Sequence, residues 1–324
     1  LIHADRVPQF ADLDMLEPIE GLMATNTDLS ADNYLEVAWN AGNYEGTQYT
    51  VPLDIHGNAM YYNTDLLDKY DANTFLDDDV VTIEEILSLD GKLDEGQYAI
   101  NNALIEWVTL ANVVNAGGDI SDEAGNPTIN TDAMRSVVEQ LKSVADAGLM
   151  SPYGEDGYAM FQSGDVLFST DGTWTSTAHG SVEGLNFGVT NIYSVTPDKF
   201  TNRSSAHLFS LLNNEDRTDE KEQGVADFLS WMRENSLDWA GAGQIVASKE
   251  VFESEEYQQY PQSFFTSSDV EKEASYIFDY KYYSYVESAL GTVLSDMIYG
   301  NITIDEGLDQ AQKTVEDLIA ENAS

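Results

Sequence analysis

The sequence predicts an α/β fold, because short runs rich in β-branched or aromatic residues alternate with amphipathic helical segments. This alternation also indicates largely parallel sheets. The 324 residues are enough for two ordinary domains, each with a complete apolar core. Turn signals are spread along the whole chain and no internal repeat is visible, so a solenoid or other repeat fold is not expected.

Four strands are predicted from short runs of β-branched and aromatic residues, namely Asn58 to Tyr62, Val166 to Ser169, Phe187 to Thr190 and His207 to Leu212. The clearest helix begins at Asp132, which can cap its start, and ends at Gly148. Its apolar residues recur at spacings of three and four. A last helix follows Thr303 and Glu306, which have capping-box spacing.

Charge excludes two classes of partner. The chain has 58 acidic and 14 basic residues and a formal net charge of -44, which would repel the phosphates of nucleic acids and anionic lipid headgroups. The composition includes 0 Cys, so disulfides, thiol catalysis and thiolate metal sites are not expected. Such a surface suits a secreted protein, and we expect any export signal to lie outside this numbering or to have been removed.

No pattern for catalysis or for a cofactor is visible. The 4 histidines share no metal-ligand spacing, and H-E-x-x-H, G-x-S-x-G, P-loop and G-x-G-x-x-G motifs do not occur. The segment from Asp119 to Gly125 lacks the glycine and the final glutamate of a calcium loop, so we interpret it as a polar turn. Paired carboxylates could perform glycoside hydrolysis, but so many acids make any single pair uninformative.

Aromatic residues beside polar ones are more informative. Trp107, Trp174 and Trp239 stand in or near turn-rich polar segments. Sugars stack their C–H faces on such rings and need directional partners for their hydroxyls, although core packing of each tryptophan stays an alternative. The segment from Tyr276 to Tyr285 carries so many rings that some should be exposed to a ligand or partner, unless it forms a packing helix.

Several segments together resemble the extracellular sugar-binding proteins of ABC importers, which include the maltodextrin-binding proteins. The run from Val51 to His56, followed by Ala59 to Leu67, resembles the first crossing strand of that family. Gly164 to Trp174 resembles its small-residue strand and Gly-x-Trp turn. The segment from His3 to Pro18 resembles a first-lobe region, and Asn301 to Ile319 resembles the terminal helix.

The resemblance implies a two-lobed periplasmic-binding-protein-like fold of class II, with discontinuous lobes and a ligand cleft between them. Residues 1–57 and 212–265 would form the N-terminal lobe, and 58–211 and 266–324 the C-terminal lobe. The lobes would close on an oligosaccharide without covalent chemistry, cofactor or metal. The resemblance further implies a monomer that delivers its ligand to the permease subunits of the importer from the cell surface, through a lipid anchor in a Gram-positive bacterium or in the periplasm otherwise.

By the same resemblance, rings stack on the sugar and polar side chains bond its hydroxyls. The expected ligand-binding residues are Asp5, Arg6, Asp54, His56, Trp107, Trp174, His207, Tyr282 and Tyr283. His56 stands where maltodextrin binders often have a glutamate, so a maltodextrin ligand is not assumed. The alternatives are an extracellular glycoside hydrolase and a binder of a non-sugar solute or of a metal held by Tyr61 and Tyr62.

Overall fold

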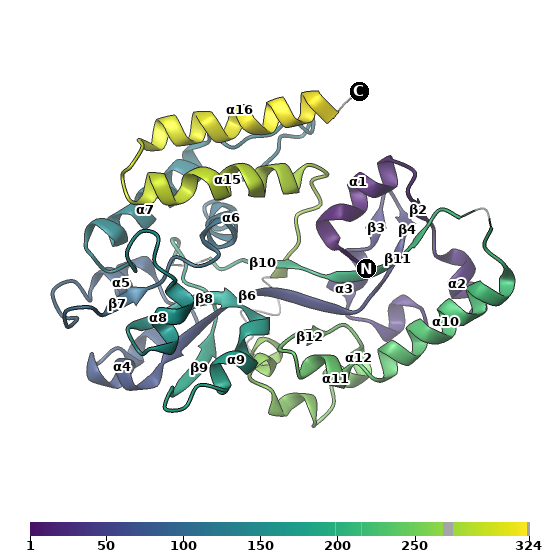
Figure 1. Ribbon diagram of the computed structural model, residues 1–324, viewed down its shortest axis with the longest axis horizontal. Helices are drawn as coiled ribbons and strands as arrows, with labels where there is room; N and C mark the ends of the chain where they lie inside the picture. The colour runs from purple at the N-terminus through teal and green to yellow at the C-terminus, as the bar shows by residue number, and fades with distance from the viewer. Residues whose placement is uncertain (198, 215, 268–274, 323–324) are drawn as a thin grey trace. The chain divides into compact units, whose positions relative to one another are not determined.

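The chain folds into two compact units, each discontinuous in sequence (Figure 1). The computed structural model describes all residues except 198, 215, 268–274 and 323–324. Unit 1 comprises Leu1–Gly57, Ser204–Ser263 and Ile277–Lys281, and unit 2 comprises Asn58–Arg203, Phe264–Tyr276 and Tyr282–Ser324. Strands β6 (Asp54–Asn63) and β10 (Asn202–Ser205) each contain a unit boundary.

The first boundary, after residue 57, is where the sequence places it. The second predicted boundary is wrong, because residues 204–211 belong to unit 1 rather than to the second lobe. Strand β11 (His207–Leu212) explains this correction, since its pairing partners β1, β2 and β5 all lie in unit 1. Residues 277–281 also return to unit 1, a segment that the sequence assigned to the other lobe.

Unit 1 is built around β11, which pairs in antiparallel fashion with three short strands. The other strands of the unit are β1 (Ile2–His3), β2 (Leu16–Glu17), β3 (Asn43–Tyr44), β4 (Thr47–Gln48), β5 (Thr50–Pro52) and β12 (Ile245–Val246). Its helices are α1 (Val7–Asp12), α2 (Glu20–Thr25), α3 (Glu36–Asn40), α10 (Asp219–Glu234), α11 (Leu237–Ala240) and α12 (Lys249–Phe252). Ala4, Leu16 and Leu208 form part of its apolar core.

Unit 2 has β6 at its centre, flanked by β8 (Val166–Gly172) and β9 (Phe187–Thr190). Two further strands are β7 (Tyr98–Ile100) and β13 (Ser275–Tyr276). The helices are α4 (Thr64–Lys69), α5 (Ile83–Leu87), α6 (Ile105–Asn115), α7 (Asp132–Asp146), α8 (Gly157–Gln162), α9 (Ser176–Gly180), α13 (Phe264–Ser267), α15 (Tyr283–Ile298) and α16 (Ile304–Asn322). Helices α15 and α16 lie side by side (Figure 1).

The four predicted strands are confirmed, lying in β6, β8, β9 and β11. The expectation of largely parallel sheets is wrong: β6 pairs antiparallel with β8, β9, β10 and β12. Among the strands that the structure describes, the parallel pairs are β7–β8 and β10–β13. Alternation of strands and helices fixes parallel pairing only when each helix crosses over to an adjacent strand, and here β6 receives strands from distant parts of the chain.

Both predicted helices are present, with one correction at a cap. Thr131, not Asp132, caps α7, because its side chain accepts a hydrogen bond from the backbone of Met134. The capping box of Thr303 and Glu306 is confirmed by reciprocal bonds between each side chain and the other's backbone N–H. Among the helices that the structure describes, none has the length and apolar character needed to cross a membrane.

Candidate functional site

Two tryptophans of unit 2 form an edge-to-face pair, here called the tryptophan pair. Trp107 lies on α6 and Trp174 lies in the short 3-10 turn that follows β8. Their ring centroids are 5.8 Å apart with the planes at 77°, and both side chains are partly exposed. Gly172 makes the position of Trp174 possible, because a Cβ there would lie 2.2 Å from the indole carbons. The indole of Trp174 therefore packs directly against the backbone of Gly172.

A buried arginine covers part of Trp107. The guanidinium carbon of Arg203 lies 3.7 Å from the centroid of the Trp107 ring, and its Nε donates to the hydroxyl of Tyr283 at 2.8 Å. The indole Nε1 of Trp107 donates to the carboxylate of Glu287. A guanidinium over an indole face is a favourable cation–π contact, so Trp107 is fixed in orientation by groups at its face and its edge.

The same cluster carries opposite charges in a partly dehydrated setting. Burial raises the pKa of the Glu106 carboxyl, the nearby charge of Glu287 raises it further, and Arg203 lowers it. Nη1 of Arg203 is buried and has no hydrogen-bond partner among the described residues. A buried guanidinium nitrogen of this kind can donate to an oxygen of a bound solute.

The late aromatic residues are divided between core and surface. Tyr283 is 1% exposed, and Phe278 and Tyr280 are also buried. Tyr282 is partly exposed and stacks on Tyr285 with centroids 5.7 Å apart. The alternative of a packing helix over this whole segment is wrong, because α15 begins only at Tyr283.

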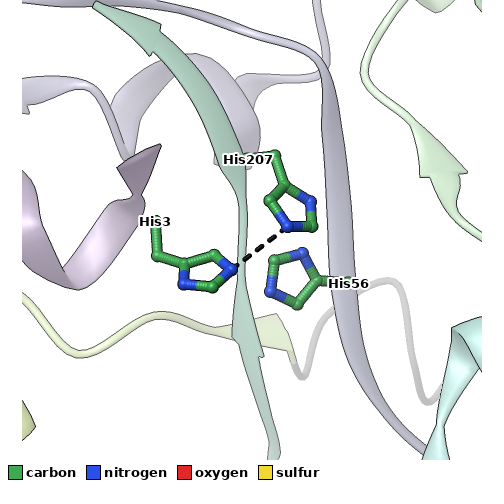
Figure 2. A group of neighbouring side chains, drawn as sticks. All are labelled: His3, His56 and His207. Carbon is green, nitrogen blue, oxygen red and sulfur yellow. Dashed lines mark hydrogen bonds between the residues drawn. The ribbon is translucent and has the colours of Figure 1, made fainter. Parts of the chain in front are cut away.

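In unit 1, three histidines from three strands come together, and we call them the histidine cluster. His3 from β1, His56 from β6 and His207 from β11 offer nitrogens that all lie within 4.8 Å of one another (Figure 2). His3 and His207 are direct cross-strand partners, and their Nε2 atoms are 3.1 Å apart. The antiparallel registers of β11 with β1 and of β6 with β10 produce this convergence.

The carboxylate of Asp54 holds two of these rings. It is 0% exposed and accepts from Nδ1 of His207 at 2.8 Å and from Nδ1 of His56 at 3.3 Å. It also accepts from the backbone N–H of His207 at 3.0 Å and from Nε1 of Trp239 at 2.6 Å. Burial raises its pKa, but the hydrogen bonds and charges of both histidines outweigh burial and hold the pKa well below the usual range.

The sequence predicts that Asp54 contacts the ligand directly, whereas its surroundings in the structure favour a role in positioning two histidines. Both carboxylate oxygens are enclosed and engaged, so Asp54 orients His56 and His207 in this structure. Asp5 and Arg6 form an ion pair of 3.3 Å between Nε and Oδ2, with Arg6 the more exposed partner. The hydroxyl contacts expected for Asp5, Arg6, His56 and His207 stay predictions.

A metal site built on Tyr61 and Tyr62 is excluded by their environment. Tyr61 is 1% exposed and its hydroxyl donates to the carbonyls of Gly172 and Thr173. Tyr62 packs over Gly188, where a Cβ would meet its ring at 2.2 Å. Tyr61 is also one of the aromatic neighbours of His179, whose pKa burial lowers to about 4.

Sequence reasoning missed Arg203, Glu287 and the grouping of His3 with the other two histidines. Arg203 carried a usable signal, since it is one of only 14 basic residues and stands among small polar residues ahead of the predicted strand from His207 to Leu212. The grouping of the histidines carried none, because positions 3, 56 and 207 meet only through strand register.

One family of known proteins matches most of the chain. Residues 1–266 match the model of a family described as bacterial extracellular solute-binding protein. No curated protein sequence matches the chain.

Solved structures with the same fold are numerous and distant in sequence. An ABC substrate-binding protein from Listeria monocytogenes, in complex with cycloalternan, has a TM-score of 0.82 at 15% identity, covering 98% of this chain and 84% of that one. The cyclic alpha-maltosyl-1,6-maltose binding protein from Arthrobacter globiformis has a TM-score of 0.76 at 19% identity, covering 99% and 84%. UgpB from Mycobacterium tuberculosis, in complex with glycerophosphocholine, has a TM-score of 0.80 at 14% identity, covering 100% and 84%.

Proposed function

The chain belongs to the family of bacterial extracellular solute-binding proteins, and from that premise we propose that it captures an oligosaccharide for an ABC importer. Family membership and the shared two-lobed α/β fold make it a binding protein rather than an enzyme. The choice of an oligosaccharide rests on the tryptophan pair. The ligands of the Listeria and Arthrobacter proteins, which are cyclic saccharides, support the same class.

The tryptophan pair offers what a sugar ring needs. Trp174 is partly exposed and is held in place over Gly172, so its ring can stack on C–H faces with little loss of side-chain entropy. Arg203 and Glu287 contact Trp107, so a donor and an acceptor for hydroxyls stand beside the apolar ring. Aromatic surface with charged edges suits a neutral polyhydroxylated solute better than a purely apolar one.

The remaining expected contacts come from polar residues of unit 1 and from Tyr282. We propose that Arg6 bonds hydroxyls and that Asp54 acts as a positioning residue for the imidazoles of His56 and His207. Substituting Asp54 should then weaken sugar binding less than substituting Trp174, since no ring contact is lost.

A titration with a panel of linear and cyclic α-glucans tests the proposal. We expect one saturable site per chain by isothermal titration calorimetry, with Trp174→Ala weakening binding at least about tenfold and the melting temperature little changed. Trp231→Ala is the matched control, because Trp231 is 57% exposed on α10 of unit 1. Intact binding by Trp174→Ala together with a large loss of stability would make Trp174 a core residue.

A non-sugar solute is the second candidate, favoured by the fold shared with a protein bound to glycerophosphocholine. Aromatic rings bind quaternary ammonium groups and the buried Arg203 suits a phosphodiester, so the same residues serve that chemistry. Glycerophosphocholine therefore joins the panel, and saturable binding of it without any sugar binding would replace the first candidate.

We propose that the protein acts as a monomer at the outside of a bacterial cell, held by a lipid anchor, and delivers its ligand to permease subunits. The family description supports the extracellular place, and the net charge of -44 disfavours nucleic acid as a partner. Analytical ultracentrifugation tests whether the protein is a monomer in solution. Fractionation of the producing cells with and without a lipase tests the anchor, and release of unmodified protein into the medium would contradict it.

A further inference from the structure

The histidine cluster of unit 1 has the composition of a transition-metal site. Imidazole nitrogens are ligands that Zn²⁺, Cu²⁺ and Ni²⁺ prefer, and three protein ligands leave one position for water or another group. Among the described residues, His3, His56 and His207 are the one group of three or more histidines or carboxylates with the spacing to hold a metal ion.

The distances fit a single ion. Zn²⁺ binds imidazole nitrogen at about 2.0–2.1 Å, so two ligands at adjacent corners of a tetrahedron stand about 3.3 Å apart. The Nε2 atoms of His3 and His207 are 3.1 Å apart. The ring centroids of His56 lie 5.3 Å from His3 and 4.4 Å from His207, and Figure 2 shows the three rings converging on one space.

Asp54 prepares two of the ligands. An ionised carboxylate accepts hydrogen bonds only, so the Nδ1 atoms of His56 and His207 that face it carry the hydrogen. Each neutral imidazole then presents the lone pair of Nε2, which is the form that a metal needs. Metal-bound histidines commonly make such a bond to a carboxylate, and here Trp239 fixes the carboxylate in turn at 2.6 Å.

The electrostatic setting also favours a cation. Asp54 adds a buried negative charge behind the rings, and the chain as a whole has a net charge of -44. His3 is exposed at the strand end, so an ion has access from solvent on that side. A hydrogen shared between the Nε2 atoms of His3 and His207 is the alternative arrangement, and titration with Zn²⁺ distinguishes the two.

We propose that His3, His56 and His207 bind one divalent transition-metal ion in unit 1, with Asp54 and Trp239 as positioning residues. The three histidines all belong to unit 1, whereas the residues of the tryptophan pair all belong to unit 2.

Zn²⁺ titration of the chelator-treated full-length chain tests the proposal. Excess Ca²⁺ and Mg²⁺ in the buffer occupy the surface carboxylates, which prefer hard cations. We expect one Zn²⁺ per chain by calorimetry and a Co²⁺ absorption spectrum of low coordination number. His3→Gln and His207→Gln should each weaken binding at least about tenfold, and Asp54→Asn by about 10–100-fold.

His179→Gln is the matched control, because it removes the one histidine outside the cluster, in unit 2. It should leave the Zn²⁺ affinity unchanged. Melting curves of each variant confirm that it is folded, and His3→Gln keeps the test decisive because an exposed strand-end residue contributes little to the core. No Zn²⁺ binding, binding abolished by Ca²⁺ and Mg²⁺, or wild-type Zn²⁺ affinity in folded His3→Gln and His207→Gln variants would each overturn the proposal.

Discussion

Replacing Gly172 by alanine should displace the Trp174 ring without removing it. A Cβ at residue 172 would lie 2.2 Å from Cη2 and Cζ2 of the indole. Carbon atoms in contact stand about 3.5 Å apart, so the ring must move by about 1.3 Å or more. If a sugar stacks on one ring face, it covers roughly 80 Å² of the 150–250 Å² that an aromatic side chain can bury, which is worth about 2 kcal/mol.

The expected outcome is therefore a dissociation constant up to about thirtyfold larger, measured by calorimetry with the tightest-binding glucan. Gly180→Ala is the matched control, since Gly180 lies on α9 of the same unit and a Cβ there meets nothing within 4 Å. Circular dichroism melts show whether either variant loses stability. Wild-type affinity in a folded Gly172→Ala variant would refute the view that the fixed position of Trp174 matters for binding.

Three further predictions concern stability. Because Thr131 caps α7, Thr131→Ala should lower the free energy of unfolding in urea by about 1 kcal/mol, and Asp132→Ala by only a few tenths. The reverse order would show that Asp132 is the cap. Burial lowers the pKa of His179 from 6.5 to about 4. Between these values the unfolded chain binds a proton at this histidine and the folded chain does not, so the free energy of unfolding falls as the pH drops from about 6.5 toward 4. This histidine changes the free energy of unfolding by at most about 1.4 kcal/mol per pH unit, and His179→Phe should remove its contribution to the pH dependence. Arg203→Lys loses the flat contact with Trp107, and the melting temperature should fall by a few degrees, whereas an unchanged value would show that this contact is not stabilising.

Local features of the chain could be predicted from the sequence because their causes are local. The strand of residues 187–190 and the capping box of Thr303 and Glu306 depend on neighbouring side chains, and the structure has both. The sequence predicts the cap of α7 one residue too late, at Asp132 instead of Thr131, because threonine and aspartate are both good caps and only backbone geometry separates them.

Features that depend on distant pairing could not be predicted in the same way. The direction of the strands around β6 and the place of residues 204–211 follow from which strands meet, and no spacing in the sequence expresses that. Trp174 could be singled out from its turn, but the covering of Trp107 by Arg203 joins residues far apart in the chain. The burial of Asp54 behind two histidines is a consequence of the same long-range register.

The most direct test of the central claim is calorimetric titration of the wild-type chain with linear and cyclic α-glucans, followed by a reducing-end assay on the same samples. Solute capture predicts one saturable sugar site per chain and no new reducing ends after prolonged incubation. Release of reducing ends, or the absence of any saturable sugar binding while glycerophosphocholine binds, would contradict the account.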